Sequence, residues 1–424
     1  MKIIDLGLNG EGITKEEGKV IFVKNALVGE DVEIKITKDG KNFAKAEALK
    51  FNKTSKNRTE PYCPYFLKCG GCQLQHMTYD SQLDYKKNLV KNTLKKIANI
   101  DFDVSETVAS DEIFFYRNKS SFPIVFKNNR VYIGMFEEVS HELIEITECK
   151  IASKIINKVL SISKTYFKNF KNSKIRYLVL RDLNDKILIT IVSKSKDIDL
   201  SEYIKTMQAE NIDFSLNLNI NQDKKQILSN EYINIYGKNY IEMEEFGLKY
   251  KINSASFMQI NNSIKEKLYL KVLSKIKNET VVDAYSGAGV LSAMIAKKAK
   301  FVYGIEISKP AVDIANNLSQ ENNIFNIAFI CGNCKMEIPK LLPNIEENFT
   351  LILDPPRSGC DKDVIHAILL AKPEKVLYIS CNPTTLSRDL KILCEKYNID
   401  EITPFDMFPQ TANVEVFTYL KIKK

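Results

Sequence analysis

The regular alternation of strand-like and helix-like segments after about residue 245 constrains the fold more than any other feature of the chain. It begins at 281–291 with VVDAYSGAGVL, an apolar strand that runs into a turn containing Gly287 and Gly289. An amphipathic helix is predicted over 260–276, and the later strand-like runs are FVYGIE, NIAFICG, FTLILD and KVLYISC. Alternation at this spacing is typical of a doubly wound α/β sheet.

Three strand ends carry features suited to one ligand. Glycines let the backbone approach a ligand at the first strand, but such a turn alone fits nucleotides, dinucleotides and S-adenosylmethionine. Glu306 ends the second strand, where a carboxylate can bind two ribose hydroxyls, and Asp354 ends a later strand before two prolines. Together these ends favour an S-adenosylmethionine methyltransferase over a dinucleotide enzyme.

The next strand ends at Cys381, before Asn-Pro and a helix that is predicted to start near Thr384. A lone strand cysteine is commonly a core residue, but a thiol at a helix N-terminus can be activated as a nucleophile, and its place beside the methyl donor favours that role. Carbon 5 of a pyrimidine becomes reactive after thiolate addition at carbon 6, and a base must then remove the carbon 5 proton. Glu415 is the candidate base because its apolar neighbours would raise its pKa, although its spacing alone fits a strand-edge carboxylate equally well.

The rest of the chain predicts two further domains. Residues 1–57 contain short strand-like runs with turns and predict a small β-barrel, residues 58–244 predict a mixed α+β region with a helix near 79–98, and residues 245–424 form the α/β domain. The net charge is +8, and basic runs at 35–58 and 150–176 suit RNA as well as a solvated lysine face. No membrane span or signal peptide is evident, so we expect a cytoplasmic protein.

The segment CPYFLKCGGC places Cys63, Cys69 and Cys72 together in a chain with nine cysteines. In a reducing compartment such a cluster indicates a metal site rather than disulfides. Three ligands leave a tetrahedral site open, and either His76 or the distant Cys149 completes it. Spacing alone leaves zinc and an iron–sulfur cluster equally open. A second C-x2-C, CGNC at 331–334, lies in the expected cofactor-binding loop and is not a metal motif.

The chain resembles the uracil-C5 RNA methyltransferases along nearly its whole length. The motifs that carry the resemblance are FMQIN, DAYSGAG, GIEIS, LDPPRSG, SCNPTTLSRDL and FPQTANVEVF, in the family's order. The resemblance implies that Cys381 is the nucleophile and Glu415 the base. It implies that S-adenosylmethionine is contacted by Gln259, Tyr285, Glu306, Asp354 and Asn333. It also implies that Phe257 and Arg117 contact RNA.

The N-terminal LGLNGEGI and the strand run after it resemble a TRAM domain, an OB-like RNA-binding module. The ribosomal RNA branch of the family carries a [4Fe–4S] cluster on four cysteines, which implies Cys63, Cys69, Cys72 and Cys149 as ligands. We therefore expect a monomeric methyltransferase of large-subunit ribosomal RNA. The alternatives are a transfer RNA methyltransferase, whose branch is shorter and lacks both features, and a catalytically silent RNA-binding iron–sulfur protein. One departure is Asn413, where the family often has histidine, which puts a proton relay there in doubt.

Overall fold

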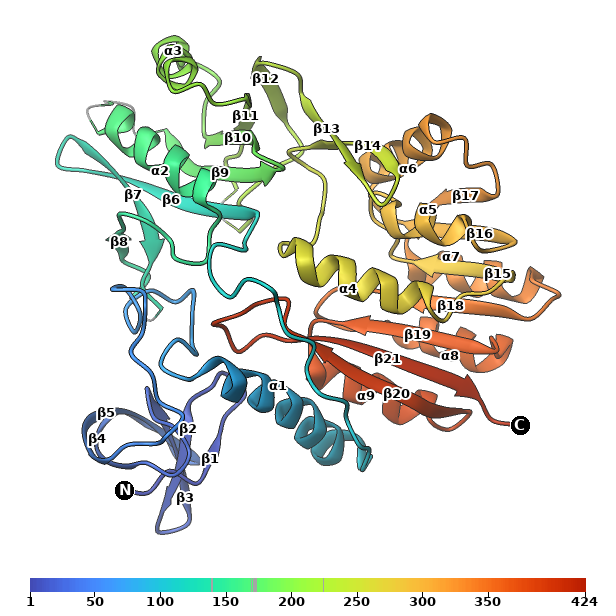
Figure 1. Cartoon of the computed structure of the whole chain (residues 1–424), viewed down its shortest axis with the longest axis horizontal. Helices are drawn as coiled ribbons and strands as arrows, with labels where there is room; N and C mark the ends of the chain where they lie inside the picture. The colour runs from blue at the N-terminus through green and yellow to red at the C-terminus, as the bar shows by residue number, and fades with distance from the viewer. Residues whose placement is uncertain (139, 169, 171–173, 224) are drawn as a thin grey trace.

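The computed structural model describes residues 1–138, 140–168, 170, 174–223 and 225–424. Three sheets follow one another along the chain, and a two-stranded hairpin joins the second to the third (Figure 1). Part of the basic run at 150–176 lies outside the described residues. Among the described residues, no helix is both long and apolar enough to cross a bilayer.

The N-terminal sheet is a small closed barrel, as predicted. Its order is β1-β2-β3-β5-β4, and the bridge between Lys2 and Asp31 joins the chain before β1 to the start of β4, which closes the barrel. Ile21, Val23 and Val32 fill the interior. The strands are β1 (Asp5–Leu6), β2 (Gly12–Glu16), β3 (Lys19–Lys24), β4 (Asp31–Asp39) and β5 (Phe43–Lys53).

A helix and a seven-stranded sheet form the middle of the chain. The helix α1 (Tyr79–Thr93) continues into a π-helical turn at Leu94–Ala98, and both pack against the C-terminal part of the chain. The helices α2 (Lys154–Phe167) and α3 (Ser201–Ala209) cover one face of the sheet. In order across the sheet, the strands are β12 (Tyr232–Tyr236), β11 (Phe214–Ile220), β10 (Lys186–Ser193), β9 (Ile175–Leu183), β6 (Lys119–Lys127), β7 (Arg130–Phe136) and β8 (Leu143–Glu145).

The C-terminal sheet confirms the predicted doubly wound α/β fold. Its order is β17-β16-β15-β18-β19-β21-β20, and all neighbours are parallel except the two pairs that β21 makes. The strands are β15 (Thr280–Ala284), β16 (Phe301–Glu306), β17 (Ile327–Cys331), β18 (Phe349–Leu353), β19 (Lys375–Ser380), β20 (Tyr397–Phe405) and β21 (Glu415–Ile422). The helices are α4 (Asn262–Leu273), α5 (Val290–Ala296), α6 (Lys309–Glu321), α7 (Cys334–Leu341, followed by a short 3-10 turn), α8 (Lys362–Ala371) and α9 (Pro383–Leu393).

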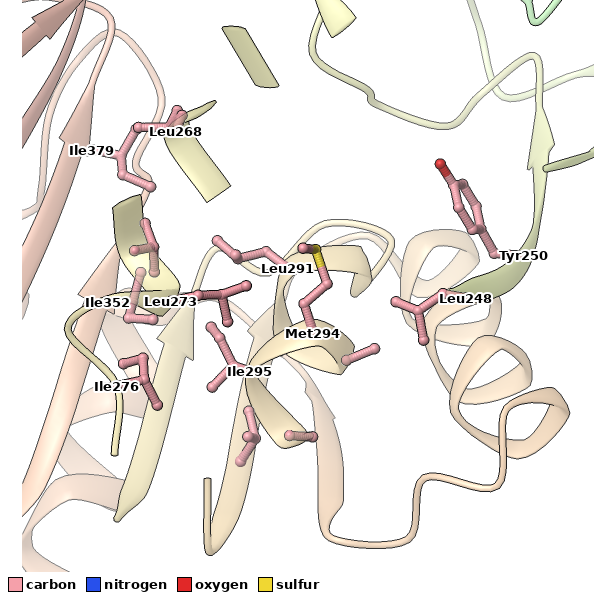
Figure 2. Close-up of a cluster of buried hydrophobic side chains, with 14 of the residues drawn as sticks. Leu248, Tyr250, Leu268, Leu273, Ile276, Leu291, Met294, Ile295, Ile352 and Ile379 are labelled. Carbon is pink, nitrogen blue, oxygen red and sulfur yellow. The ribbon is translucent and has the colours of Figure 1, made fainter. Parts of the chain in front are cut away.

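Apolar side chains bury both faces of this sheet. On one face the hairpin β13 (Tyr240–Glu245) and β14 (Leu248–Asn253) packs with α5, so that Leu248 and Met294 belong to the same core (Figure 2). On the other face Val90 of α1 and Leu386 of α9 share a second core with Leu351 of β18. The middle region and the C-terminal sheet are therefore joined by buried apolar contacts.

Candidate active site

Strand register brings three of the predicted cofactor residues to one edge of the sheet. Ala284 at the end of β15 is level with Ile305 on one side and Leu353 on the other. The next residues along the three strands are Tyr285, Glu306 and Asp354, which therefore lie level at the carboxyl edge. The strand order reverses between β15 and β18, which is where open α/β sheets bind their ligands.

The glycine turn after β15 is held by the carboxylate of Glu306. Glu306 Oε2 accepts a hydrogen bond from the Gly287 N–H at 3.1 Å, and Oε1 accepts from the Ser308 N–H at 2.7 Å. Gly289 has a φ of +77°, and a Cβ added there would stand 2.7 Å from Ala315 and Phe329. The glycine is therefore required both by the backbone conformation and by the neighbouring side chains.

A pocket lies at this edge, and several predicted residues line it. Its wall includes Phe257, Gln259, Tyr285 and Asp354, together with Asp283. Gln259 is buried, whereas Phe257 is 69% exposed at the pocket. Asn333 is not part of this wall: its side chain caps α7 and accepts a hydrogen bond from the Lys335 N–H at 3.0 Å.

Two acidic groups in this pocket have raised pKa values. Burial raises the pKa of Asp354 to about 7, and the charge of Asp283 adds to the effect. Burial likewise raises the pKa of Asp283 to about 7, against a hydrogen bond from the Ser292 hydroxyl that lowers it. Perturbed carboxyl groups in a pocket of this kind are typical of functional sites.

Cys381 and Glu415 face each other across two neighbouring strands. β19 and β21 pair antiparallel with Ser380 opposite Val416, so the next pair in the register is Cys381 and Glu415. Glu415 is only 3% exposed, and Cys381 is half-buried. The chain position of these two residues gave no indication of this pairing, because β21 inserts between β19 and β20.

The two facing groups influence each other's protonation. Burial raises the pKa of Cys381 to about 11, the charge of Glu415 raises it further, and Arg357 lowers it through its charge and a hydrogen bond. Burial also raises the pKa of Glu415 well above its usual value, with Asp354 adding to the rise and Arg357 opposing it. The expected effect of the apolar neighbours on Glu415 is confirmed. Of the expected activators of the thiol, Arg357 is a nearby polar group that lowers its pKa, but burial has the larger effect.

Arg357 was missed by the sequence interpretation. It lies within the quoted LDPPRSG motif, three residues after Asp354, and it is exposed. Its guanidinium is the cation that lowers the pKa of both Cys381 and Glu415. An arginine in the loop after a carboxylate-bearing strand end is the signal that would have indicated it.

The loop that leads to Glu415 is held by residues from the middle of the chain. The Gln410 N–H donates to Gln82 Oε1 at 3.0 Å, and Gln82 Nε2 donates to Gln410 Oε1 at 3.0 Å. The N–H groups of Gln73 and Leu74 both donate to the Gln410 carbonyl, at 3.1 and 2.9 Å. Gln410 has a φ of +70°, and Lys86 forms a buried ion pair with Asp406 at the start of the loop. The cysteine-containing segment and α1 therefore fix the approach to Glu415.

Asn413, at the position where the resembling family often has histidine, is exposed. Its amide Nδ2 donates to Thr411 Oγ1 at 3.4 Å, within the same loop. This contact supports the local turn and includes no group that titrates near neutral pH.

The four cysteines predicted as ligands line one cavity of about 310 Å³. Cys63, Cys69 and Cys72 come from the loop before α1, and Cys149 from the segment before α2. Burial raises the pKa of Cys69 to about 11, and the charges of Cys149 and Cys63 raise it further. A cation placed among the four sulfur atoms would stabilise them as thiolates.

His76, the alternative fourth ligand, faces a different cavity. It lines a space between the barrel and the cysteine loop, with Cys69 and Cys72 but without Cys63 or Cys149. Its ring lies against Phe66, both ring nitrogens lack a hydrogen-bond partner within the described chain, and burial lowers its pKa to about 4. Within the described ranges, no three His, Cys, Asp or Glu side chains are close enough to hold a single metal ion.

Neither the CGNC cysteines nor Arg117 lines the pocket that contains Phe257. In CGNC, Cys331 is exposed at the end of β17 and Cys334 is buried in the first turn of α7, so the two thiols occupy unlike environments. Arg117 lines the cysteine cavity, not the pocket with Phe257, and its Nε donates to the Lys119 carbonyl at 2.8 Å. The two residues predicted to contact RNA therefore lie at different sites.

Comparison with known proteins agrees with this geometry. The model of the tRNA (uracil-5-)-methyltransferase family matches residues 78–423, and the TRAM domain model matches residues 2–49. An uncharacterized RNA methyltransferase of Clostridium acetobutylicum is 37% identical over 99% of this chain and 96% of its own length. One of Caldanaerobacter subterraneus is 38% identical over 97% and 95%.

Among solved structures, the Pyrococcus abyssi tRNA (uracil-54, C5)-methyltransferase in complex with S-adenosyl-L-homocysteine is similar with a TM-score of 0.81. The two chains are 28% identical, and the match covers 99% of this chain and 98% of that one. The expectation that transfer RNA enzymes of this kind are shorter than this chain is therefore wrong for this example. The chain belongs to the tRNA (uracil-5-)-methyltransferase family of S-adenosylmethionine-dependent RNA methyltransferases, and it carries an N-terminal TRAM domain.

Proposed function

We propose that this enzyme methylates carbon 5 of a uridine in large-subunit ribosomal RNA. The observation that carries the chemistry of this proposal is the pairing of Cys381 with Glu415 across β19 and β21, at the edge where Tyr285 and Asp354 line a pocket. The choice of ribosomal RNA rests on the resemblance of the cysteine set to that of the ribosomal RNA branch. Addition of a thiol to carbon 6 and removal of a proton from carbon 5 take place on adjacent atoms of one ring. A nucleophile and a base on directly neighbouring strands suit that chemistry.

Each residue has a distinct role in this proposal. Cys381, after loss of its proton, adds to carbon 6 as the thiolate, and the electrons move toward the ring carbonyl to make carbon 5 nucleophilic. S-adenosylmethionine, when bound, supplies the methyl group as an electrophile. Glu415 then takes the proton from carbon 5, and the Sγ–carbon 6 bond breaks to release 5-methyluridine. Arg357 favours the charged forms of both Cys381 and Glu415.

The residues at the carboxyl edge fit S-adenosylmethionine. The two carboxylate oxygens of Glu306 each accept a single backbone N–H, from Gly287 and from Ser308, so each keeps a lone pair for a ribose hydroxyl. Gln259, Tyr285 and Asp354 line the adjoining pocket. We assign these four residues to cofactor binding, with Asn333 as a contact near the N-terminus of α7.

The cysteine cavity fits a [4Fe–4S] cluster bound by Cys63, Cys69, Cys72 and Cys149. Four thiols around one space match the ligand set of such a cluster, and zinc also accepts four thiolates. A cubic cluster holds its ligands further apart than a single ion does, which suits four thiols that surround a cavity of about 310 Å³. We assign the cluster a structural role, because the cysteine loop holds Gln410 in place.

RNA binding is assigned to the barrel and to residues around the pocket. Phe257 is exposed beside the pocket and suits stacking on a base that has left its helix. Arg117 lines the cysteine cavity, and we assign its guanidinium to RNA binding. We further propose that the enzyme works as a monomer in the cytoplasm.

A second candidate substrate is transfer RNA. The similar Pyrococcus abyssi enzyme, whose name specifies uracil 54 of tRNA, aligns with this chain over almost its whole length, including the N-terminal region. Chain length and the presence of an N-terminal region, which suggested the ribosomal RNA branch, therefore do not by themselves separate the two substrates.

The deciding experiment offers both substrates to the purified protein. Methyl-labelled S-adenosylmethionine is supplied with large-subunit ribosomal RNA transcripts or with unmodified tRNA, and 5-methyluridine is mapped in each product. We expect label in the ribosomal transcript at a defined uridine. Label in tRNA alone would establish the second candidate, and no label in either under single-turnover conditions would support a catalytically silent RNA-binding protein.

A further inference from the structure

Two cations face each other on the central sheet, and neither forms an ion pair with a described residue. β6 and β9 pair antiparallel, and Lys119 is directly opposite Arg181 in the register. Directly opposed residues of an antiparallel pair project from the same face of the sheet, so the ammonium and the guanidinium share one side. Like charges in this arrangement destabilise a sheet.

Burial makes this arrangement more costly. Arg181 is only 3% exposed; its Nη2 donates to the Ser256 carbonyl at 2.6 Å, and its Nη1 has no hydrogen-bond partner within the described chain. Burial lowers the pKa of Lys119 to about 8, and the charges of Arg181 and Arg117 lower it further. Burial lowers the pKa of Arg181 to about 10, opposed only by Tyr232.

Among the residues that the structure describes, no carboxylate shifts the pKa of Lys119 or Arg181. Asp182 follows Arg181 in the chain, but alternate residues of a strand point to opposite faces, and the Asp182 carboxylate interacts with Ser153 and Asp185 instead. Among the ion pairs of the described residues, none includes Lys119 or Arg181. A buried cation that serves only the fold is normally paired.

The cation pair lies against the loop that lines the active-site pocket. Arg181 holds the Ser256 carbonyl, and the neighbouring Asn118 Nδ2 donates to the Gln259 carbonyl at 3.0 Å. Phe257, exposed at the pocket, lies between these two anchored residues. Lys119 and Arg181 therefore lie close to the 256–259 loop, beside which the target nucleotide enters in the proposed function.

We propose that Lys119 and Arg181, with Arg117 beside them, form a binding site for a backbone phosphate of the substrate RNA next to the target nucleotide. The proposal rests on the proposed function for the placing of the target base. Lys119 is less buried than Arg181, so we assign direct contact with the phosphate to its ammonium, and Arg181 adds its charge from the buried side. The unpaired cations cost stability in the free protein, and the phosphate of the bound RNA offsets that cost.

The test uses the full-length protein with Lys119→Met, which removes one of the two like charges. We expect RNA affinity to fall about tenfold at moderate salt and the slope of log affinity against log salt to decrease by about one. The loss should be the same for a ribosomal RNA transcript, a tRNA transcript and poly(U), because a phosphate carries no sequence. The melting temperature should stay unchanged or rise, and S-adenosylmethionine binding should be unaffected.

Two further variants make the result decisive. Lys127→Met, at the exposed end of the same strand, is the matched control and should change neither affinity nor slope. Lys119→Glu places a carboxylate opposite Arg181 and should stabilise the fold while weakening RNA binding more than Lys119→Met does. A lower melting temperature for Lys119→Met with an unchanged salt slope would overturn the proposal. Because these measurements use binding without turnover, they are independent of the 5-methyluridine assay that tests the proposed function.

Discussion

The chain contains two cysteine environments that are built in opposite ways. In the cavity beside β6, four thiols surround one space, and the charge of Cys149 raises the pKa of Cys63, Cys69 and Cys72. At the end of β19, Cys381 stands alone beside the carboxylates of Glu415 and Asp354 and the guanidinium of Arg357. An added cation would stabilise the first environment, whereas the second already includes a cation of its own.

This difference shows which kinds of functional site can be recognised from the spacing of residues in the sequence. Three cysteines within ten residues indicate a metal site through their spacing, because ligands of one metal must meet in space. A reacting thiol needs only one position, and its reactivity depends on neighbours that arrive from other strands. The clustered cysteines and Cys381, the proposed nucleophile, are therefore expected to respond differently to substitution.

The largest effect is expected for Cys381→Ala. Without the thiol, carbon 5 of uracil is not activated, so methyl transfer should fall by at least about 1,000-fold while S-adenosylmethionine binding is retained. Single-turnover transfer of labelled methyl groups measures the first and calorimetry the second. Cys394→Ala, a half-buried thiol at the end of α9, is the control and should remain active. Turnover by Cys381→Ala would show that another group is the nucleophile.

The next effect is expected for Cys72→Ser in the four-thiol cavity. Loss of one ligand should remove the proposed cluster and lower the melting temperature by roughly 5 °C or more, because metal binding contributes to folding. Iron and sulfide analysis, with absorbance near about 400 nm in anaerobically purified protein, measures the site. A wild-type protein that contains zinc and no iron would refute the cluster assignment while leaving the role of Cys381 untouched.

The two environments are linked through Gln410, and Gln82→Met tests that link. The change removes the side-chain hydrogen bonds to Gln410 at nearly constant volume, so the loop before Glu415 should shift. We expect addition by Cys381 to continue and product release to slow about 10- to 100-fold, because small displacements of a catalytic group are costly. The readout is the ratio of covalent adduct to free product at each time. An equal loss of adduct and product would indicate a general loss of folded protein instead.

The smallest effect is expected for Arg357→Gln, and it depends on pH. Arg357 lowers the pKa of both Cys381 and Glu415, so its loss should raise both values. Each group must lose its proton to react; the rate near neutral pH should therefore fall about tenfold and recover as the pH rises, with the whole profile displaced to higher pH. A uniform loss at every pH would mean that Arg357 acts by contact with RNA alone.

The doubly wound sheet and the barrel could be predicted from the sequence because they depend on periodicity. The position of Glu306 and Asp354 beside one ligand could be predicted because each residue ends a strand. The facing of Cys381 and Glu415 could not be derived from periodicity, because it depends on β21 inserting antiparallel beside β19. The opposition of Lys119 and Arg181 likewise depends on pairing between strands that are distant in the chain. Strand partners, and the charges they bring together, are properties of tertiary structure.

The most direct test of the account is the fate of RNA mixed with Glu415→Gln in the presence of S-adenosylmethionine. If Cys381 adds to carbon 6 and Glu415 removes the carbon 5 proton, this variant should stop after methyl transfer, and a methylated protein–RNA adduct should survive on a denaturing gel. The double variant Cys381→Ala with Glu415→Gln should form none. Free 5-methyluridine at the wild-type rate, or an adduct that persists without Cys381, would contradict the account.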